Sequence, residues 1–150
     1  MTRPPMSVQL YTVRDQLDAD AAGTIEALSA MGFTAVEPFG LPDLPSTVRE
    51  ALVAHGLTTP TAHGSVLART AETMTAARDL GVQTIIEPYQ APERFADRES
   101  VAAVAAELTA AAVVAATHGI TVGYHNHDAE LSSTIDGVPA LLVLAELTDP

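Results

Sequence analysis

One stretch decides the fold: residues 80–86, with the sequence Leu80-Gly81-Val82-Gln83-Thr84-Ile85-Ile86. Its glycine suits the left-handed backbone that ends a helix, and the β-branched residues after it suit a half-buried strand. The same succession of a helix-like run, a glycine and a strand-like run recurs around Gly32, Gly56 and Gly119. The repeat predicts a chain in which helices and strands alternate.

An opening strand is expected at residues 7–11, and further strands are expected after each glycine, at 33–36, 57–59, 82–86 and 120–124. Apolar residues spaced three apart, as at Ile25, Leu28 and Met31, predict that the runs before the glycines are helices with one buried face. We expect Asp18 or Asp20 to cap the first helix and Ser46 to cap the second, because short polar side chains bond the free N–H groups of a first turn; further helices are expected at about 100–117 and 138–147.

Strands that alternate with helices of about 10–15 residues indicate a parallel sheet with right-handed crossovers. Such a sheet is either open and doubly wound or closed into a barrel. No Gly-x-Gly-x-x-Gly follows the first strand, so the fingerprint of a dinucleotide-binding fold is missing. We therefore favour an α/β fold of the (β/α) TIM-barrel type, with about five βα units in residues 1–150 and a barrel that is not closed.

The composition narrows the classes of partner. Seven basic residues against nineteen acidic ones give a net charge of −12, which opposes binding to nucleic acid or to an anionic membrane. The most apolar stretch, 101–116, is expected to be too short and too weakly hydrophobic to cross a membrane. The chain has no cysteine and no apolar leader at its N-terminus, so we expect a cytoplasmic protein.

Polar residues gather where the predicted strands end, which is where a (β/α) barrel holds its active site. They are Gln9, Tyr11, Glu37, His63, Glu87 and the run His125-Asn126-His127-Asp128-Ala129-Glu130. Strand alternation puts His125 and His127 on one face and Asn126 on the other. We expect the two imidazoles to point toward Glu37, His63 and Glu87 in one cavity, where imidazole can move a proton or bind a metal. A purely structural histidine pair with solvated acids is the alternative.

Four segments carry a family resemblance: residues 7–15, residues 32–37, His63 and residues 123–130. In this order they resemble the sugar phosphate isomerase/epimerase family, which has a xylose-isomerase-like barrel. The resemblance implies a (β/α)8 barrel longer than this chain. It also implies one divalent cation, Mn²⁺ or Mg²⁺, and isomerisation, epimerisation or dehydration of a sugar or polyol.

Roles for single residues follow from the matched positions and the strand ends together. The predicted catalytic residues are His125, His127, Glu37 and His63, the predicted substrate-binding residues are Gln9, Tyr11, Glu87 and Asn126, and the predicted metal ligand is Glu130. In the family the other metal ligands come from the sixth to eighth strands, which this sequence does not contain. Metal binding by this chain alone is therefore expected to be weak or absent.

Two other functions stay open. In the first alternative, the chain is a non-catalytic barrel fragment or a half-barrel, and its unpaired strand edges should make it self-associate. The related fold of apurinic-site endonucleases would instead imply DNA binding, which the charge of −12 opposes.

Overall fold

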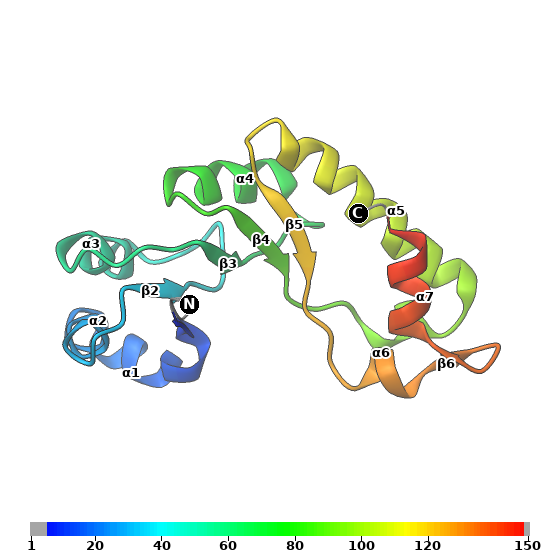
Figure 1. Cartoon of the computed structure of the whole chain (residues 1–150), viewed down its shortest axis with the longest axis horizontal. Coiled ribbons are helices and arrows are strands. Elements are labelled where there is room, and N and C mark those ends of the chain that lie inside the picture. Colours follow the sequence, from blue (N-terminus) through cyan, green and yellow to red (C-terminus); the bar gives the residue numbers. More distant parts are fainter. Residues whose placement is uncertain (1–5, 149–150) are drawn as a thin grey trace, which may run out of the picture.

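The computed structural model describes residues 6–148 of the chain. Five parallel strands form its centre (Figure 1): β1 (Ser7–Gln9), β2 (Ala35–Glu37), β3 (Thr61–His63), β4 (Thr84–Glu87) and β5 (Thr121–Tyr124). The helices between and after them are η1 (Leu10–Val13), α1 (Arg14–Ala19), α2 (Ala21–Ala30), α3 (Ser46–Ala54), α4 (Thr70–Asp79), η2 (Pro92–Phe95), α5 (Arg98–Ala116), α6 (Ala129–Ser132) and α7 (Ala140–Leu147). A short hairpin, β6 (Thr134–Ile135) with β7 (Val138–Pro139), joins α6 to α7.

The five strands lie side by side in chain order. β1 pairs with β2, and β3, β4 and β5 form one ladder, all parallel. Isolated bridges from Ala35 to Thr58 and from Leu41 to Gly64 link the two groups. Within residues 6–148, β1 and β5 each pair on one side only, so the sheet is not closed. This arrangement confirms the predicted α/β class with parallel strands and is compatible with the predicted open barrel.

The repeated glycines end helices as predicted, since the φ angles of Gly32, Gly56, Gly81 and Gly119 are all positive, between 63° and 92°. The cap of α2 is Asp20, whose carboxylate accepts a hydrogen bond of 2.9 Å from Gly23 N. The repeat thus identified the helix ends without any knowledge of tertiary contacts.

Three local predictions were wrong. The third strand ends at His63 as expected but begins at Thr61, not at Leu57, because in 57–59 the strand pairing is limited to the Thr58 bridge and Leu57 packs into the core. Ser46 is the first residue of α3 rather than its cap, since Pro45 occupies the capping position and no side chain bonds the first turn. Met31 is 73% exposed, because α2 ends at Ala30 and carries Met31 off the apolar face.

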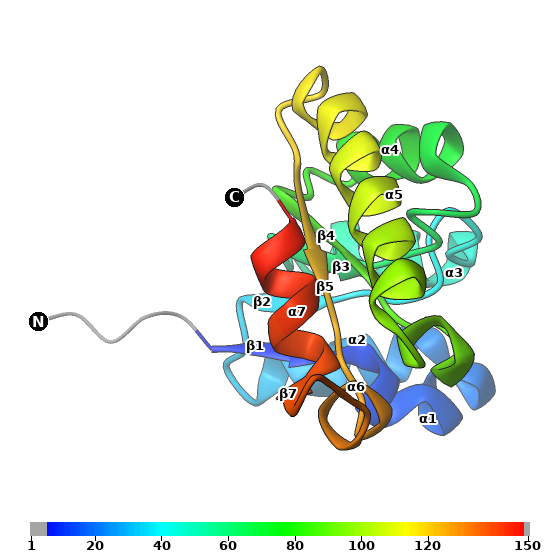
Figure 2. The ribbon, with the colours of Figure 1, turned by 90° about the vertical axis from the view of Figure 1, so that its right-hand side faces the viewer.

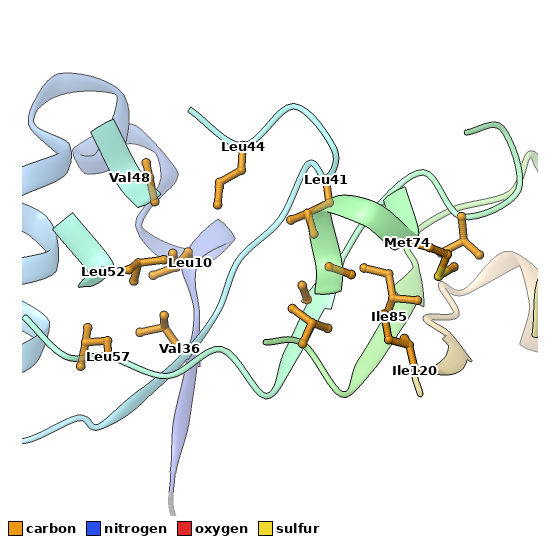
Figure 3. Close-up of a cluster of buried hydrophobic side chains, with 14 of the residues drawn as sticks. Leu10, Val36, Leu41, Leu44, Val48, Leu52, Leu57, Met74, Ile85 and Ile120 are labelled. Atoms are coloured by element: carbon orange, nitrogen blue, oxygen red, sulfur yellow. The ribbon is translucent and has the colours of Figure 1, made fainter. Parts of the chain in front are cut away.

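Alternate strand residues face the helices and form the core. Val36 and Ile85 are buried with Met74 and Leu52 of the flanking helices (Figure 3), and Ala62 of β3 belongs to the same buried cluster. The strand residues between them therefore point to the opposite, inner face of the sheet. This alternation decides which polar side chains can share a site.

A second apolar cluster lies beside β5. Val101, Val104 and Leu108 of α5 pack against Val143 and Leu144 of α7, which runs alongside (Figure 2). By length and composition alone α5 could cross a membrane, so the sequence-based argument against this was wrong. Its packed face is equally typical of a core helix, and the predicted absence of a membrane partner stays a prediction.

Candidate functional site

A cavity of about 410 Å³ lies at the C-terminal ends of the five parallel strands. Each strand end contributes to its wall, which consists of Gln9, Tyr11, Phe39, Gly40, His63, Gly64, Ser65, Pro88, Tyr89, His125 and His127. Four residues predicted from the sequence, besides His63, are thus in this wall. A small polar ligand would meet imidazole, amide and aromatic groups here.

His63 is the most firmly held polar group of the cavity. It ends β3 on the inner face, is 6% exposed, and places Nδ1 3.1 Å from Glu37 Oε1 on the neighbouring strand. Gln9 Nε2 lies 3.1 Å from the same ring nitrogen. Thr61, two residues earlier on β3, donates its hydroxyl to the other oxygen of Glu37. Four inner-face side chains of β1, β2 and β3 therefore form one hydrogen-bonded group.

This arrangement assigns the tautomer of His63. A carboxylate oxygen accepts hydrogen bonds, so the proton of the neutral ring belongs on Nδ1, facing Glu37. The amide of Gln9 then turns its oxygen toward the ring, since the positions of amide N and O are interchangeable. Nε2 is left with a free lone pair, and it is buried without any hydrogen-bond partner in the part of the chain described.

Burial favours the neutral form of this imidazole. It lowers the pKa of His63 below the ordinary value of 6.5, and the neighbouring His125 lowers it further, while Glu37 acts in the opposite direction. At neutral pH His63 is therefore an uncharged base with one available nitrogen.

The other two histidines stand beside it. The rings of His63 and His125 are 5.2 Å apart between centroids, and those of His125 and His127 are 5.0 Å apart, both edge to face. Although β5 ends at Tyr124, His125 N donates to Glu87 O at 3.0 Å and continues the ladder by one residue. The expected common face of the two histidines is thus what the structure has.

Aromatic rings complete the wall. Tyr11 and Phe39 meet edge to face at 5.2 Å, and Tyr89 meets His127 at 5.5 Å. Arg14 lies over the Tyr11 ring, 4.6 Å from its centre. The sequence did not single out Phe39 or Tyr89 as site residues, although each comes two residues after a strand-ending glutamate, and that position was the available signal.

The structure does not bring every predicted residue into the cavity: Glu37 is absent from the cavity wall and contacts it only through His63. Glu87 is 5% exposed, and its carboxylate accepts hydrogen bonds from Leu67 N at 3.0 Å and from Gln90 Nε2 at 2.9 Å. It has the same strand parity as buried Ile85, so it turns away from the inner face. Asn126 donates from Nδ2 to His127 O at 3.0 Å and is likewise absent from the cavity wall. We therefore do not keep Glu87 and Asn126 as ligand-contacting residues.

Glu130 is also placed differently from a metal ligand at an open site. It is 1% exposed and accepts hydrogen bonds from Tyr124 Oη and from His127 N, the latter at 3.0 Å. Across residues 6–148 there is no group of three or more histidine, aspartate or glutamate side chains arranged to hold a metal ion. The residues described thus do not fit a metal centre of their own.

Comparison with known proteins finds similar folds among solved structures. No family model and no curated protein matches the sequence. A crystal structure of a sugar phosphate isomerase/epimerase from Parabacteroides distasonis is similar over 100% of this chain and 63% of its own, with a TM-score of 0.80 and 19% identity. A second structure with the same description and organism is similar over 99% of this chain and 66% of its own, with a TM-score of 0.75 and 18% identity.

The chain thus spans about two thirds of the length of these two proteins. The TM-scores of 0.80 and 0.75 show a common fold. At 18–19% identity they show nothing about activity, which has to be argued from the site. The chain has the α/β fold of two solved sugar phosphate isomerase/epimerase structures.

Proposed function

We propose that this chain carries part of the substrate site of an enzyme that isomerises, epimerises or dehydrates a sugar or polyol. One observation carries the proposal: His63, in the cavity wall, is oriented by Glu37 and keeps a buried nitrogen without a partner. A buried nitrogen of this kind is costly unless something bonds to it, and a ligand hydroxyl or acidic carbon can do so once the neighbouring rings of the cavity wall move to admit it. The fold likeness to two sugar phosphate isomerase/epimerase structures supports the same reading.

All three reactions share a step that suits this geometry. A proton leaves the carbon next to a carbonyl group, present in the sugar or in a keto form of the polyol, and a base with a pKa near neutral takes it. Nε2 of neutral His63 accepts the proton, and Glu37, at Nδ1, stabilises the imidazolium that forms. In isomerisation the proton is then delivered to the neighbouring carbon of the enediol. In epimerisation a proton is returned to the same carbon from the opposite face, and in dehydration a proton is given to the hydroxyl group on the neighbouring carbon, which leaves as water when its C–O bond breaks. His125, 5.2 Å away, is the second group able to give or take a proton.

Ligand titration of this chain tests the proposal. A panel of neutral ketoses and polyols is added while the imidazole signals of all five histidines are followed by NMR. We expect the signals of His63, His125 and His127 to shift, and those of His55 and His118, which stand at helix ends outside the cavity, to stay unchanged. If no member of the panel moves the three cavity histidines at millimolar concentration, the proposed substrate class is wrong.

The divalent cation implied by the family resemblance stays a proposal for the whole enzyme. Since residues 6–148 do not fit a metal centre, such a cation would need ligands from outside them. If bound, it would polarise the oxygens of the substrate. Calorimetric titration of this chain with Mn²⁺ should show weak binding or none.

A second candidate function is a self-associating barrel fragment. One observation favours it: a cavity of about 210 Å³ lies along β5 between α5 and α7, lined mainly by apolar side chains such as Leu108, Val122 and Leu144. Nearby Val113 and Leu142 are 67% and 56% exposed. An unpaired edge next to apolar surface favours association with another chain. Sedimentation of a stable monomer at high concentration would count against this candidate.

A further inference from the structure

Glu130 lies at the start of α6 and is hydrogen-bonded to Tyr124, the last residue of β5. Its side chain is 1% exposed, although a buried carboxylate normally needs compensation by several donors. Both of its oxygens have one: Oε1 accepts from the Tyr124 hydroxyl and Oε2 accepts from His127 N at 3.0 Å. This enclosure leaves no open face from which a cation could approach.

Tyr124 belongs to the same buried group. Its ring lies on the helix side of the sheet, 6.1 Å from the Phe95 ring. Burial and the hydrogen bond to Glu130 raise the pKa of the Tyr124 phenol well above its ordinary value of 10. Tyr124 is therefore a neutral donor to Glu130 at neutral pH.

The backbone of His127 is held at both of its polar groups by side chains. Its N–H donates to Glu130, and its C=O accepts from Asn126 Nδ2 at 3.0 Å. His127 lies beyond the end of β5, where no ladder fixes the backbone. Two side chains thus supply the hydrogen bonds that a neighbouring strand would otherwise supply.

We infer that Glu130, together with Asn126, is a positioning residue of the cavity rather than a metal ligand. By fixing the backbone of His127, the pair keeps the imidazoles of His125 and His127 at 5.0 Å from each other on the cavity wall. The inference deepens the proposed function, because this spacing serves binding only if the imidazoles contact the ligand. The placement itself can be tested without any ligand.

Amide hydrogen exchange of this chain measures how firmly the backbone N–H of His127 is hydrogen-bonded. In the unchanged chain we expect the His127 amide to be protected. Glu130→Gln should speed its exchange by roughly 10-fold, because a charge-assisted hydrogen bond is replaced by a weaker neutral one. Tyr124→Phe should leave the His127 bond in place and change the rate much less. An unprotected His127 amide in the unchanged chain would overturn the inference.

Glu87→Gln is the matched control. Glu87 is an equally buried carboxylate that also accepts from one backbone N–H and one side chain. Its replacement should lower thermal stability to a similar degree without exposing the His127 amide. If both variants speed this exchange equally, Glu130 merely stabilises the fold and the inference is wrong.

Two spectroscopic readouts separate positioning from the alternatives. The nuclear Overhauser effect between the ring protons of His125 and His127 should weaken in Glu130→Gln and in Asn126→Ala, and persist in Glu87→Gln. Mn²⁺ added to the unchanged chain should leave the signals of Glu130 sharp; selective broadening centred on Glu130 would restore its role as a metal ligand. A protected His127 amide with no response to ketoses or polyols would uphold the positioning role and reject the proposed function.

Discussion

Glu37 and Glu87 have the same local sequence, a glutamate that ends a strand and precedes a proline, yet they serve different faces of the sheet. Glu37 shares the inner face with Gln9, its register partner on β1, and contacts His63. Glu87 has the same strand parity as Ile85, which packs against the helices. Its carboxylate accepts a hydrogen bond from Leu67 N and so fixes the loop that contains Leu67. The same dipeptide therefore supports the cavity in one place and the scaffold in another.

The difference shows that strand parity, not residue type, decides which face of the sheet each of these carboxylates occupies. In β2 the helix-facing residue is Val36, one position before the glutamate, whereas in β4 it is Ile85, two positions before. A shift of one residue moves a side chain to the other face. Each prediction below tests whether the inner face carries the chemistry and the helix face the stability.

The largest effect is expected at the inner face. In the enzyme proposed above, His63→Ala should lower turnover by roughly 10²–10⁴-fold, as is typical for the loss of a general acid or base. The measurement is kcat at saturating substrate for the variant and for His55→Ala, a histidine at the end of α3 that lies outside the cavity. Turnover within threefold or so of normal in His63→Ala would reduce His63 to a packing role.

The next largest effect concerns stability at the helix face. Glu87→Leu should lower the free energy of unfolding by about 2–4 kcal/mol, because the N–H of Leu67 and the amide of Gln90 lose their acceptor. Glu37→Leu should cost less, since the Glu37 side chain is 17% exposed and water can reach its partners more easily. Urea unfolding of both variants measures the two losses. Equal losses would mean that the two glutamates do not divide the roles as argued.

How much of this the sequence could predict depends on the range of the interactions involved. The repeated glycines and the two-residue period act locally, so the α/β order and the common face of His125 and His127 followed from them. The parity of Glu87 depends on where β4 ends against its neighbours, which is a long-range property. The enclosure of Glu130 needs Tyr124 and the turn into α6 together, and the sequence pattern gave no sign of it. Phe39 and Tyr89 reach the cavity through loops whose paths no period describes.

A smaller effect is expected from pH. Because the pKa of His63 is lowered in the folded chain, the unfolded chain takes up this proton first as the pH falls through about 6.5. The folded state then loses stability until the pH reaches the lower pKa of the folded form. Comparing unfolding free energies at pH 7.5 and 5.0 should show a loss that His63→Gln removes. Glu37→Gln should enlarge the loss, because Glu37 acts to raise the pKa of His63.

The smallest effect is expected at Thr61, where the comparison is sharpest. Thr61 donates its hydroxyl to Glu37 from the inner face, and Thr61→Val keeps the shape and β-propensity of the side chain while removing this donor. The free energy of unfolding should fall by about 1 kcal/mol, the net worth of one hydrogen bond. Turnover of the proposed enzyme should fall only a few-fold, because His63 Nδ1 still holds Glu37 from the other side. Thr59→Val is the control: its hydroxyl donates to Leu80 O at the end of α4, outside the cavity wall, so a similar loss of stability should leave turnover unchanged. If Thr61→Val lowers turnover as strongly as His63→Ala does, the orientation of Glu37 matters more for turnover than the base His63. Glu37, rather than His63, would then be the central residue of the inner face.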